Sequence, residues 1–345
     1  MDRVGPRTAS TRTIALRIQH VGIQGLGLIG SSVARSLRPH LRISGFDPDP
    51  LVREKAIAAD LAVVESPGHL SDCDLVLLAA PTEVNAGLLK DEMAAGAERI
   101  VADLGSVKAP IERVWLENNS DYPFVGSHPM SGSELSGFNA GTADLFADAS
   151  WPVVIHERTN PEALMALLWI VVLLRGRPIP MSAARHDAEV AQVSHLAQVL
   201  AGALGRESHD RPDDELTVRL AGGAYRDVSR LSAAPPNRTA EFLIANGPNA
   251  AQAARSTAED LLEVAKALEA GDRAEVVNWL TPAHQLRAKF TNRWEPAQKL
   301  DVVGTAAELT KLLLDRRDTA VWVSDLQQDA DSSWRLTLNV AKSSP

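Results

Sequence analysis

Short apolar runs alternate with amphipathic stretches through the first half of the chain. The runs predict strands at residues 18–24, 41–46, 75–79, 100–102, 124–126 and 151–155, and the stretches between them predict helices at 27–37, 50–59 and 83–95. The run at 75–79 is apolar at every position, which is typical of a strand buried on both faces. Because strands and helices alternate, we expect an α/β fold of the Rossmann type, with a doubly wound and mostly parallel sheet.

The pattern becomes helical after about residue 180. Helices are predicted at 182–204, 213–221, 223–233, 238–246, 248–269 and 272–294, and no alternating strand pattern interrupts them. The tail differs again, with one predicted helix at 306–314 and two short strands at 321–324 and 335–340. We therefore expect a flexible N-terminus (1–16), a dinucleotide-binding Rossmann domain (17–180), an all-α dimerisation and substrate domain (181–295) and a small C-terminal α+β extension (296–345).

Two of the predicted helices, at 182–204 and 248–269, have wide apolar faces. One small helical domain has too little surface of its own to cover both faces. We therefore expect the chain to form a homodimer through this domain.

Composition narrows the class of protein. The formal net charge of −9 and the lack of a long basic run argue against a nucleic-acid surface. Cys73 is the single cysteine, so no internal disulfide can form, which favours a reducing cytoplasm. The longest apolar stretch, 163–174, is too short to span a bilayer, and residues 1–16 carry no apolar core typical of a signal peptide. We expect a cytoplasmic protein without a membrane partner.

A glycine-rich loop joins the first predicted strand to the first helix. It reads Gly25-Leu26-Gly27-Leu28-Ile29-Gly30, the GxGxxG pattern of dinucleotide-binding folds. Gly25 permits the tight turn, Gly27 lets a pyrophosphate approach the backbone, and Gly30 lets the helix pack closely on the strand. The amino terminus of the helix then attracts the anion.

An acidic residue ends the second predicted strand. Asp47 lies 22 residues after Gly25, where a carboxylate accepts hydrogen bonds from both ribose hydroxyls. The same carboxylate repels a 2′-phosphate, so we expect NAD rather than NADP as cofactor. Ala80 and Pro81, which follow the run at 75–79, complete the expected cofactor-binding set, and no metal is expected.

Two loops rich in reactive side chains follow later strands. Residues 103–108 read Asp-Leu-Gly-Ser-Val-Lys, and residues 126–134 read Gly-Ser-His-Pro-Met-Ser-Gly-Ser-Glu. Both lie at the carboxyl ends of strands, where open α/β sheets bind ligands. The helical half adds the pair His186-Asp187, a histidine at position 195 and the stretch 225–230, Tyr-Arg-Asp-Val-Ser-Arg.

Each of these residues also has an ordinary structural interpretation. His128 precedes a proline and fits a turn, and Ser106 fits a helix N-cap. His195 lies in an apolar helix and fits a satisfied core position, Arg230 fits a surface charge, and His186-Asp187 fits a charge pair at a helix start. The functional interpretation is favoured because all of these residues occur together in a chain with a predicted dinucleotide-binding fold.

The combination resembles the prephenate/arogenate dehydrogenases of tyrosine biosynthesis. The resemblance runs from about residue 19 to 294, and its most specific parts are Gly-Ser-Val-Lys at 105–108, Ser-His-Pro-Met-Ser-Gly-Ser-Glu at 127–134 and Arg-Asp-Val-Ser-Arg at 226–230. It implies an enzyme that passes hydride from C4 of a cyclohexadienyl acid to NAD while the ring carboxylate leaves as CO₂. Prephenate is the expected substrate, with arogenate or a related cyclohexadienyl acid, including a 4-amino-4-deoxy one, as the alternative.

The resemblance also implies roles for individual residues. By similarity, His128 takes the proton of the substrate C4 hydroxyl, which suits an imidazole, and Ser106 bridges that histidine, the hydroxyl and the nicotinamide. Arg230 is similar to the arginine that binds a substrate carboxylate, and Asp227 would hold the arginine segment in place. Glu134 resembles a residue at the entrance of the site.

Two positions depart from the family pattern in the region that contacts the substrate side chain. His195 lies near the substrate end of its helix, and Gln198 stands on the same face where relatives that prefer prephenate often carry a second histidine. Thr239 replaces an aromatic residue that some members have. These departures leave the choice between prephenate and arogenate open.

Three further interpretations remain. A β-hydroxyacid or 6-phosphogluconate-like dehydrogenase would use a lysine on the helical domain, and the stretch 182–204 contains none. A non-catalytic nucleotide-binding module would not need both His128 and Arg230. The extension at 296–345 could be a partial amino-acid-binding regulatory domain that responds to tyrosine, although about 50 residues is short for such a fold.

Overall fold

The structure, a computed structural model, describes residues 18–96, 99–133, 135–211, 213–330 and 332–342. The N-terminus that was expected to be flexible, 1–16, lies outside the described residues. The chain divides into two compact units. The first contains the described residues up to Asp187 together with Lys299–Asn339, and the second contains Ala188–Gln298 and the residues from Val340 on.

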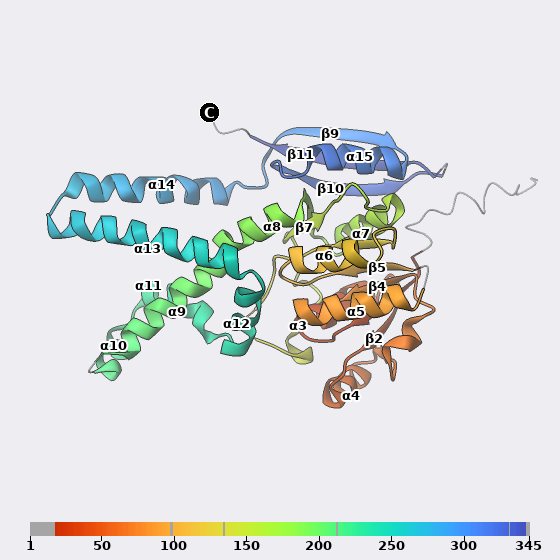
Figure 1. The fold of residues 1–345 in the computed structure, drawn as a ribbon, viewed down its shortest axis with the longest axis horizontal. Helices are drawn as coiled ribbons and strands as arrows, with labels where there is room; N and C mark the ends of the chain where they lie inside the picture. Colours follow the sequence, from red (N-terminus) through yellow and green to blue (C-terminus); the bar gives the residue numbers. More distant parts are fainter. Residues whose placement is uncertain (1–17, 97–98, 134, 212, 331, 343–345) are drawn as a thin grey trace, which may run out of the picture. The chain divides into compact units, whose positions relative to one another are not determined.

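A six-stranded parallel sheet forms the centre of the first unit (Figure 1), in the order β3-β2-β1-β4-β5-β6. Every strand pairs in parallel with its neighbours, as between Val21 and Ile43 and between Val21 and Leu75. The strands are β1 (His20–Gln24), β2 (Arg42–Phe46), β3 (Ala62–Val63), β4 (Leu75–Leu78), β5 (Ile100–Asp103) and β6 (Phe124–Gly126). The predicted Rossmann-type fold is therefore confirmed, and the two-residue β3 is an addition to it.

Helices and short 3₁₀ turns connect these strands: α3 (Leu28–Leu37), α4 (Pro50–Ala58), η1 (Pro67–Leu70), α5 (Thr82–Ala94), α6 (Ala109–Asn118), η2 (Phe138–Ala140) and α7 (Pro161–Leu173). The sequence pattern did not predict α6 or α7. In α7 the reason is burial, because eight of its residues are buried and no polar face gives the sequence a helical period. Asn160 begins α7 by accepting hydrogen bonds from the backbone N–H groups of Glu162 and Ala163.

A second, two-stranded sheet pairs β7 (Ser150–Val154) with β8 (Arg177–Met181) in parallel. The residues Gly176-Arg177-Pro178 suggest a turn at the domain boundary, but Arg177 and Pro178 lie in β8, so that interpretation is wrong. Pro178 and Pro180 lack the N–H that an inner strand needs, but β8 has β7 as its one ladder partner among the described strands and tolerates them.

Most of the C-terminal extension, Lys299–Asn339, belongs to the first unit. It forms β9 (Pro296–Gly304), α15 (Ala306–Arg316), β10 (Val321–Gln328) and β11 (Trp334–Ala341), with the sheet order β10-β11-β9. α15 packs on α7, and β10 packs on both α7 and β8. The helix and two of the strands were predicted; β9 was not, because most of its side chains are exposed and give no apolar alternation. Regulation by tyrosine through this extension stays a prediction.

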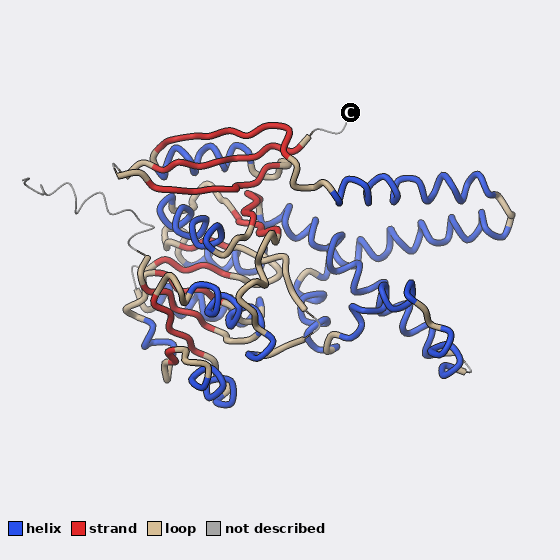
Figure 2. Tube along the Cα trace, turned by 180° about the vertical axis from the view of Figure 1, so that it is seen from behind, coloured by secondary structure: helices blue, strands red, loops and turns tan. Residues whose placement is uncertain are grey.

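The described residues of the second unit before β9 are helical (Figure 2). They form the end of α8 (Ala183–Val190), a π-helical turn η3 (Ala191–His195), α9 (Leu196–His209), α10 (Asp214–Leu220), α11 (Gly223–Ser229), η4 (Arg230–Ala233), α12 (Pro236–Ala245), α13 (Gly247–Glu269) and α14 (Arg273–Thr291). The predicted helical domain is confirmed. Of the described helices, none is both long and apolar enough to cross a membrane.

Candidate active site

The glycine loop between β1 and α3 has the backbone that a dinucleotide needs. Gly25 has φ +98°, and a Cβ there would lie 2.8 Å from the carbonyl oxygen of Ala79. A Cβ on Gly30 would lie 1.8 Å from the oxygen of Gly25, so the helix can approach the strand only with glycine at that position. A Cβ on Gly27 would meet nothing within 4 Å, so the loop leaves open space where a pyrophosphate would lie. The residues present therefore fit a dinucleotide.

The start of α3 is free to receive an anion. Among the described residues, no side chain caps this helix and its first turn carries no acidic residue. Leu28 and Ile29 occupy that turn and are half-buried, whereas Leu26 is completely buried against Gly45. The partial positive charge of the helix terminus is therefore directed at the open space beside Gly27.

Asp47 is held firmly beside this loop. Its Oδ2 accepts the backbone N–H of Leu26 at 2.8 Å, and its Oδ1 accepts that of Asp49 at 3.0 Å. Each carboxylate oxygen has a second lone pair for a ribose hydroxyl. The nearby Arg53 donates from Nη1 to the backbone carbonyls of Asp47 at 2.6 Å and Pro48 at 3.0 Å.

A buried polar network ties three strand ends together. Asn85 donates from Nδ2 to Oδ1 of Asp103 at 2.6 Å and accepts the N–H of Ala80 at 3.0 Å, so the loops after β4 and β5 are joined. The ammonium of Lys108 pairs with Oδ2 of Asp103 and donates to the carbonyl of Ser127, the residue before His128, at 2.8 Å. This network fixes the position of the loop after β6.

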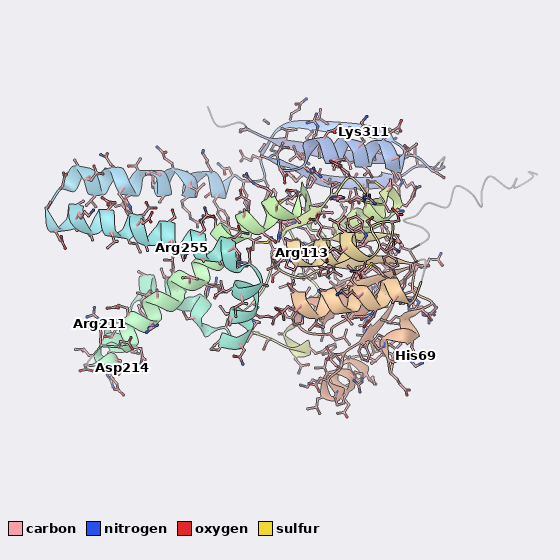
Figure 3. The ribbon with its side chains drawn as sticks, viewed as in Figure 1. His69, Arg113, Arg211, Asp214, Arg255 and Lys311 are labelled. Atoms are coloured by element: carbon pink, nitrogen blue, oxygen red, sulfur yellow. The ribbon has the colours of Figure 1, made fainter. Side chains whose placement is uncertain are left out.

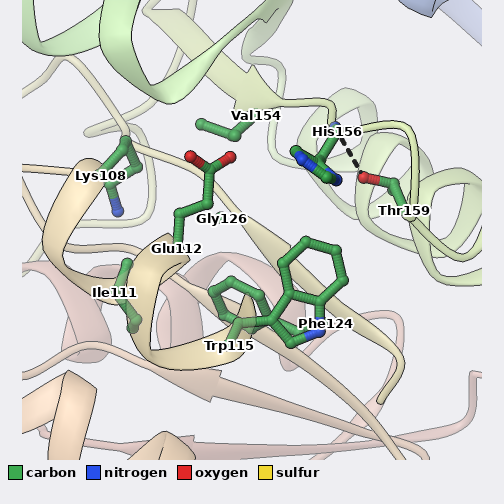
Figure 4. Close-up of a pocket in the computed structure, with 9 residues that line it drawn as sticks. All are labelled: Lys108, Ile111, Glu112, Trp115, Phe124, Gly126, Val154, His156 and Thr159. Carbon is green, nitrogen blue, oxygen red and sulfur yellow. Dashed lines mark hydrogen bonds between the residues drawn. The ribbon is translucent and has the colours of Figure 1, made fainter. Parts of the chain in front are cut away.

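Lys108 is completely buried. Burial lowers the pKa of its ammonium to about 7, although the negative charge of Asp187 opposes that shift. Lys108 also lines a small cavity together with Glu112, Trp115 and His156 (Figure 4). The cavity has about 10 Å³ of free space, enough for about one water molecule and too little for a ring acid.

His128 is the outer member of a chain of three side chains. Its Nδ1 lies 3.0 Å from Nε2 of His186, and the two rings meet edge to face. Nδ1 of His186 lies 2.7 Å from Oδ1 of Asp187. The carboxylate of Asp187 also accepts the backbone N–H groups of Lys108 at 2.8 Å and Ala109 at 2.9 Å, which are the N-cap and the first residue of α6. Asp187 therefore caps α6 and orients His186 at the same time.

These contacts determine which nitrogen of His186 and of His128 carries the proton. The carboxylate of Asp187 only accepts, so Nδ1 of His186 carries its proton and Nε2 of His186 accepts from Nδ1–H of His128. Nε2 of His128 is then the ring nitrogen without the proton, the form a general base requires. Burial lowers the pKa of His186, although its hydrogen bond to Asp187 opposes that shift, so His186 stays neutral near pH 7.

Sequence reasoning missed the roles of His186 and Asp187. The pair had been interpreted as charges at the start of its own helix, but Asp187 caps a different helix, 78 residues earlier in the chain. The available signal was a His-Asp dipeptide inside an otherwise Ala-rich stretch. Ser106 does not cap α6; Lys108 occupies the N-cap position, and Ser106 lies half-buried in the loop before it.

In the second unit, His195 ends the π-helical turn and is 1% exposed. Its Nδ1 lies 3.2 Å from Nδ2 of Asn246, and its ring stacks on Phe242 at 5.0 Å. Asn249 donates to Oδ1 of Asn246 at 2.8 Å, which leaves the amide Nδ2 of Asn246 to donate to His195. Nε2 of His195 then carries the proton and is a donor. π-Helical turns inside α-helices are frequent at functional sites.

The remaining predicted substrate residues lie on neighbouring elements of the second unit. Arg230 is exposed and begins η4, which packs on α9. Gln198 is half-buried in the first turn of α9. Asp227 is exposed, and its carboxylate lies 3.6 Å from Nε of Arg226. Glu134 lies outside the described residues. The predicted site residues thus divide between the units, with His128 and Ser106 in the first.

Two family models match the chain. "Prephenate dehydrogenase, nucleotide-binding domain" matches residues 33–179, and "Prephenate dehydrogenase, dimerization domain" matches residues 182–282. Together the two matches cover most of the chain.

Relatives agree with these matches. A cyclohexadienyl dehydrogenase from Zymomonas mobilis is 33% identical over 67% of this chain and 82% of its own length. A prephenate dehydrogenase from Bacillus subtilis is 29% identical over 65% of this chain and 63% of its own length. Among solved structures, a putative prephenate dehydrogenase from Corynebacterium glutamicum shares the fold with a TM-score of 0.74, 23% identity and coverage of 86% of this chain and 96% of that one.

Two alanine substitutions in the glycine loop should have different effects, one on NAD binding and the other on stability. Gly27→Ala adds a methyl group that meets no protein atom but fills the open space, so we expect the dissociation constant for NAD to rise about tenfold or more, or 1.4 kcal/mol, with unchanged thermal stability. Gly30→Ala forces its methyl group into the oxygen of Gly25, and we expect a loss of about 1–3 kcal/mol of unfolding free energy. Calorimetric titration and denaturant unfolding measure the two effects. Wild-type NAD affinity in Gly27→Ala would contradict the proposed position of the pyrophosphate.

The histidine pKa predicts how stability depends on pH. His186 has a lowered pKa in the folded protein, so below about 6.5 the unfolded chain binds a proton that the folded chain does not. The stability that the neutral ring contributes is present above that value and is lost as the pH falls toward the folded pKa. Unfolding in denaturant at pH 7.5, 6.5 and 5.5 should show a decreasing free energy, with a weaker decrease in His186→Gln. The exposed His284→Gln is the control, and equal slopes in both variants would refute the assignment.

Proposed function

The chain belongs to the prephenate dehydrogenase family, a family of dinucleotide-dependent dehydrogenases, and from this premise we propose that it oxidatively decarboxylates prephenate to 4-hydroxyphenylpyruvate in tyrosine biosynthesis. In this reaction C4 loses a hydride, its hydroxyl loses a proton, and the ring carboxylate leaves as CO₂ as the ring becomes aromatic. The observation that carries the proposal is the Asp187–His186–His128 chain, because it leaves a base without a proton in the unit that carries the dinucleotide loop.

The cofactor of this reaction is NAD. When bound, NAD supplies the nicotinamide ring that accepts the hydride. Asp47 favours NAD over NADP, since its carboxylate suits two ribose hydroxyls and repels a 2′-phosphate. Arg53, the first cation after Asp47 in the sequence, donates hydrogen bonds to two backbone carbonyls. It would have to give up these bonds before it could hold a phosphate. Ala80 and Pro81 follow β4 beside the loop, where Gly25 already approaches Ala80.

His128 is the general base of the mechanism. Its Nε2 takes the proton of the C4 hydroxyl as the hydride leaves, and the positive charge that develops on the ring is stabilised through His186 by the carboxylate of Asp187. This is the role that the carboxylate of a Ser-His-Asp triad performs for its histidine. Ser106, from the loop after β5, donates its hydroxyl to the same substrate oxygen and holds the substrate in line with the base.

Most of the other proposed substrate-binding residues belong to the second unit. Arg230 presents a planar guanidinium, which can donate two parallel hydrogen bonds to a carboxylate of the substrate. His195 offers Nε2–H as a donor, and Gln198 offers a neutral amide on the same helix. Asp227 positions the arginine segment, and Glu134, which resembles a family residue at the entrance of the site, lies outside the described residues.

Arogenate is the alternative substrate. The Zymomonas mobilis relative is a cyclohexadienyl dehydrogenase, and a solved Synechocystis arogenate dehydrogenase shares the fold with a TM-score of 0.65 at 24% identity, over 79% of this chain and all of that one. The neutral amide of Gln198, where relatives that prefer prephenate often have a histidine, is compatible with the keto acid of prephenate and with the amino acid of arogenate.

A reducing cytoplasm is the compartment that this assignment implies. Cys73 is the single cysteine of the chain, and its thiol is free and buried. Burial and the neighbouring charge of Asp72 raise the pKa of this thiol to about 11, so it is an unreactive structural side chain.

The active form is a homodimer built through the second unit. That unit matches the family's dimerization domain, and large apolar side chains are exposed on α13 and α14, which lie side by side (Figures 1 and 2). Leu262 is 64% exposed and Leu286 is 68% exposed in the single chain. We expect light scattering to give the mass of two chains, and Leu262→Glu with Leu286→Glu to shift the protein toward the monomer. A wild-type monomer at micromolar concentration would contradict the proposal.

The catalytic assignment is tested by one assay and two variants. The purified protein is incubated with prephenate or arogenate and with NAD or NADP, and formation of the reduced nicotinamide is followed by its absorbance. His128→Asn should lower kcat about 10²- to 10⁴-fold with unchanged NAD affinity, because it removes the base and leaves the glycine loop intact. His186→Gln should lower kcat less, since His128 keeps its lone pair and loses only its hydrogen-bond link through His186 to the carboxylate of Asp187.

Two results would contradict the assignment. If neither substrate reduces either cofactor, the proposed reaction is wrong. If the wild type is active and His128→Asn retains its kcat, the reaction stands but the base is another group.

A further inference from the structure

The turn that follows α15 in the C-terminal extension lies against the start of α8. The carboxylate of Asp318 accepts the backbone N–H of Ser182 at 2.7 Å and its hydroxyl at 2.8 Å. The backbone N–H of Asp318 donates to the carbonyl of Pro180 at 3.2 Å, and Nη1 of Arg317 donates to the carbonyl of Ile155 at 2.9 Å. Two consecutive residues of the extension thus contact the chain at the carboxyl ends of β7 and β8, and β8 leads directly into α8.

Ser182, the residue that Asp318 binds, stands at the start of α8, the helix that contains His186 and Asp187. Ser182 directly precedes α8, and its carbonyl accepts the backbone N–H of His186 at 2.9 Å, a bond of the first helical turn. α8 has only eight residues before the π-helical turn, so its own hydrogen bonds give its first turn little stability. Fixing Ser182 therefore fixes His186 and Asp187, one turn later.

The backbone of Asp318 suits this contact. Its φ is +64°, in the left-handed region that aspartate tolerates better than most side chains. A turn in this conformation lets the N–H and the carboxylate of one residue bond to the neighbouring positions 180 and 182 simultaneously.

Arg317, in the same turn, also places a positive charge near the carboxylates of Glu112 and Asp187. Glu112, in the first turn of α6, has a raised pKa because of its burial and of the charge of Asp187, and the charge of Arg317 opposes that rise. Two carboxylates, Glu112 and Asp187, therefore share the amino terminus of α6, and Arg317 offsets part of their mutual repulsion.

We propose that Asp318 of the C-terminal extension is a positioning residue for the proposed reaction: by fixing Ser182 it holds His186 in hydrogen-bond contact with His128. The inference rests on the proposed function. It assigns the extension a role in catalysis that the matched family domains do not supply, since those matches end at residues 179 and 282.

The test uses two variants of the full-length dimer and a matched control. Asp318→Gly removes the carboxylate and keeps the left-handed turn, which glycine adopts without strain. Asp318→Asn keeps one acceptor oxygen and should retain part of the effect. The control is Lys311→Ala, an exposed residue on α15 of the same extension (Figure 3).

For Asp318→Gly we expect kcat to fall about 5- to 20-fold while the KM for NAD stays unchanged. The acidic limb of the kcat pH profile should move to lower pH, because His128 loses the partner that stabilises its protonated form. Amide hydrogen exchange across residues 183–190 should accelerate, which is independent of activity. Asp318→Asn should lie between wild type and Asp318→Gly, and Lys311→Ala should match wild type.

The outcomes separate this inference from the proposed function. If the wild type is active and Asp318→Gly retains wild-type kcat and exchange, the positioning role is wrong and the function stands. Faster exchange with unchanged kcat would show a structural contact only and would also overturn the inference. If the wild type is inactive with both substrates, the proposed function fails and the inference fails with it. The exchange result then reports only whether Asp318 stabilises the start of α8.

Discussion

The proposed chemistry of the first unit depends on one buried carboxylate, that of Asp187. A buried carboxylate is costly unless donors surround it, and Asp187 is 2% exposed. Its donors include two backbone N–H groups at the amino terminus of α6 and Nδ1–H of His186. Because a carboxylate only accepts, Nδ1 of His186 carries the proton, and the tautomer of His128 follows from that of His186.

The rest of the unit brings this carboxylate and the cofactor loop to the same edge of the sheet. The parallel strands end together, so the loops after β1, β4, β5 and β6 are neighbours, and Asn85, Asp103 and Lys108 join three of them by side-chain hydrogen bonds. The ion pair of Asp103 with Lys108 is fully buried, and such pairs fix geometry more than they add stability. Here the geometry fixed is that of Ser127 and therefore of His128.

The elements that the sequence predicted are those whose information is local. The glycine loop, Asp47 and the strand at 75–79 are each defined by spacing and residue type within a short window. The helices of the second unit were predicted because each has one apolar face. By contrast, α7 is buried all round, β8 contains two prolines and β9 is mostly exposed, so their patterns carry no period. Those elements depend on the neighbours against which they pack.

The candidate site divides in the same way. His128 and Ser106 could be selected from motif and position, whereas the link from His128 to His186 spans 58 residues and the cap by Asp187 spans 78. The contact between Asp318 and Ser182 spans 136 residues, and nothing in the local sequence of either residue indicates it. Contacts of this range follow from the topology of the sheet and from the packing of the extension.

The positions of the protons on His186 and His128 decide whether His128 can act as the base. Long-range ¹H–¹⁵N correlation spectra of the ¹⁵N-labelled protein at pH 7.5, with His128→Asn and His186→Gln used for assignment, identify the protonated nitrogen of each ring. We expect a proton on Nδ1 in both rings and an unprotonated Nε2 in His128. A proton on Nε2 of His128 would rule out the proposed mechanism, because the group proposed as the base would then have no lone pair for the substrate hydroxyl.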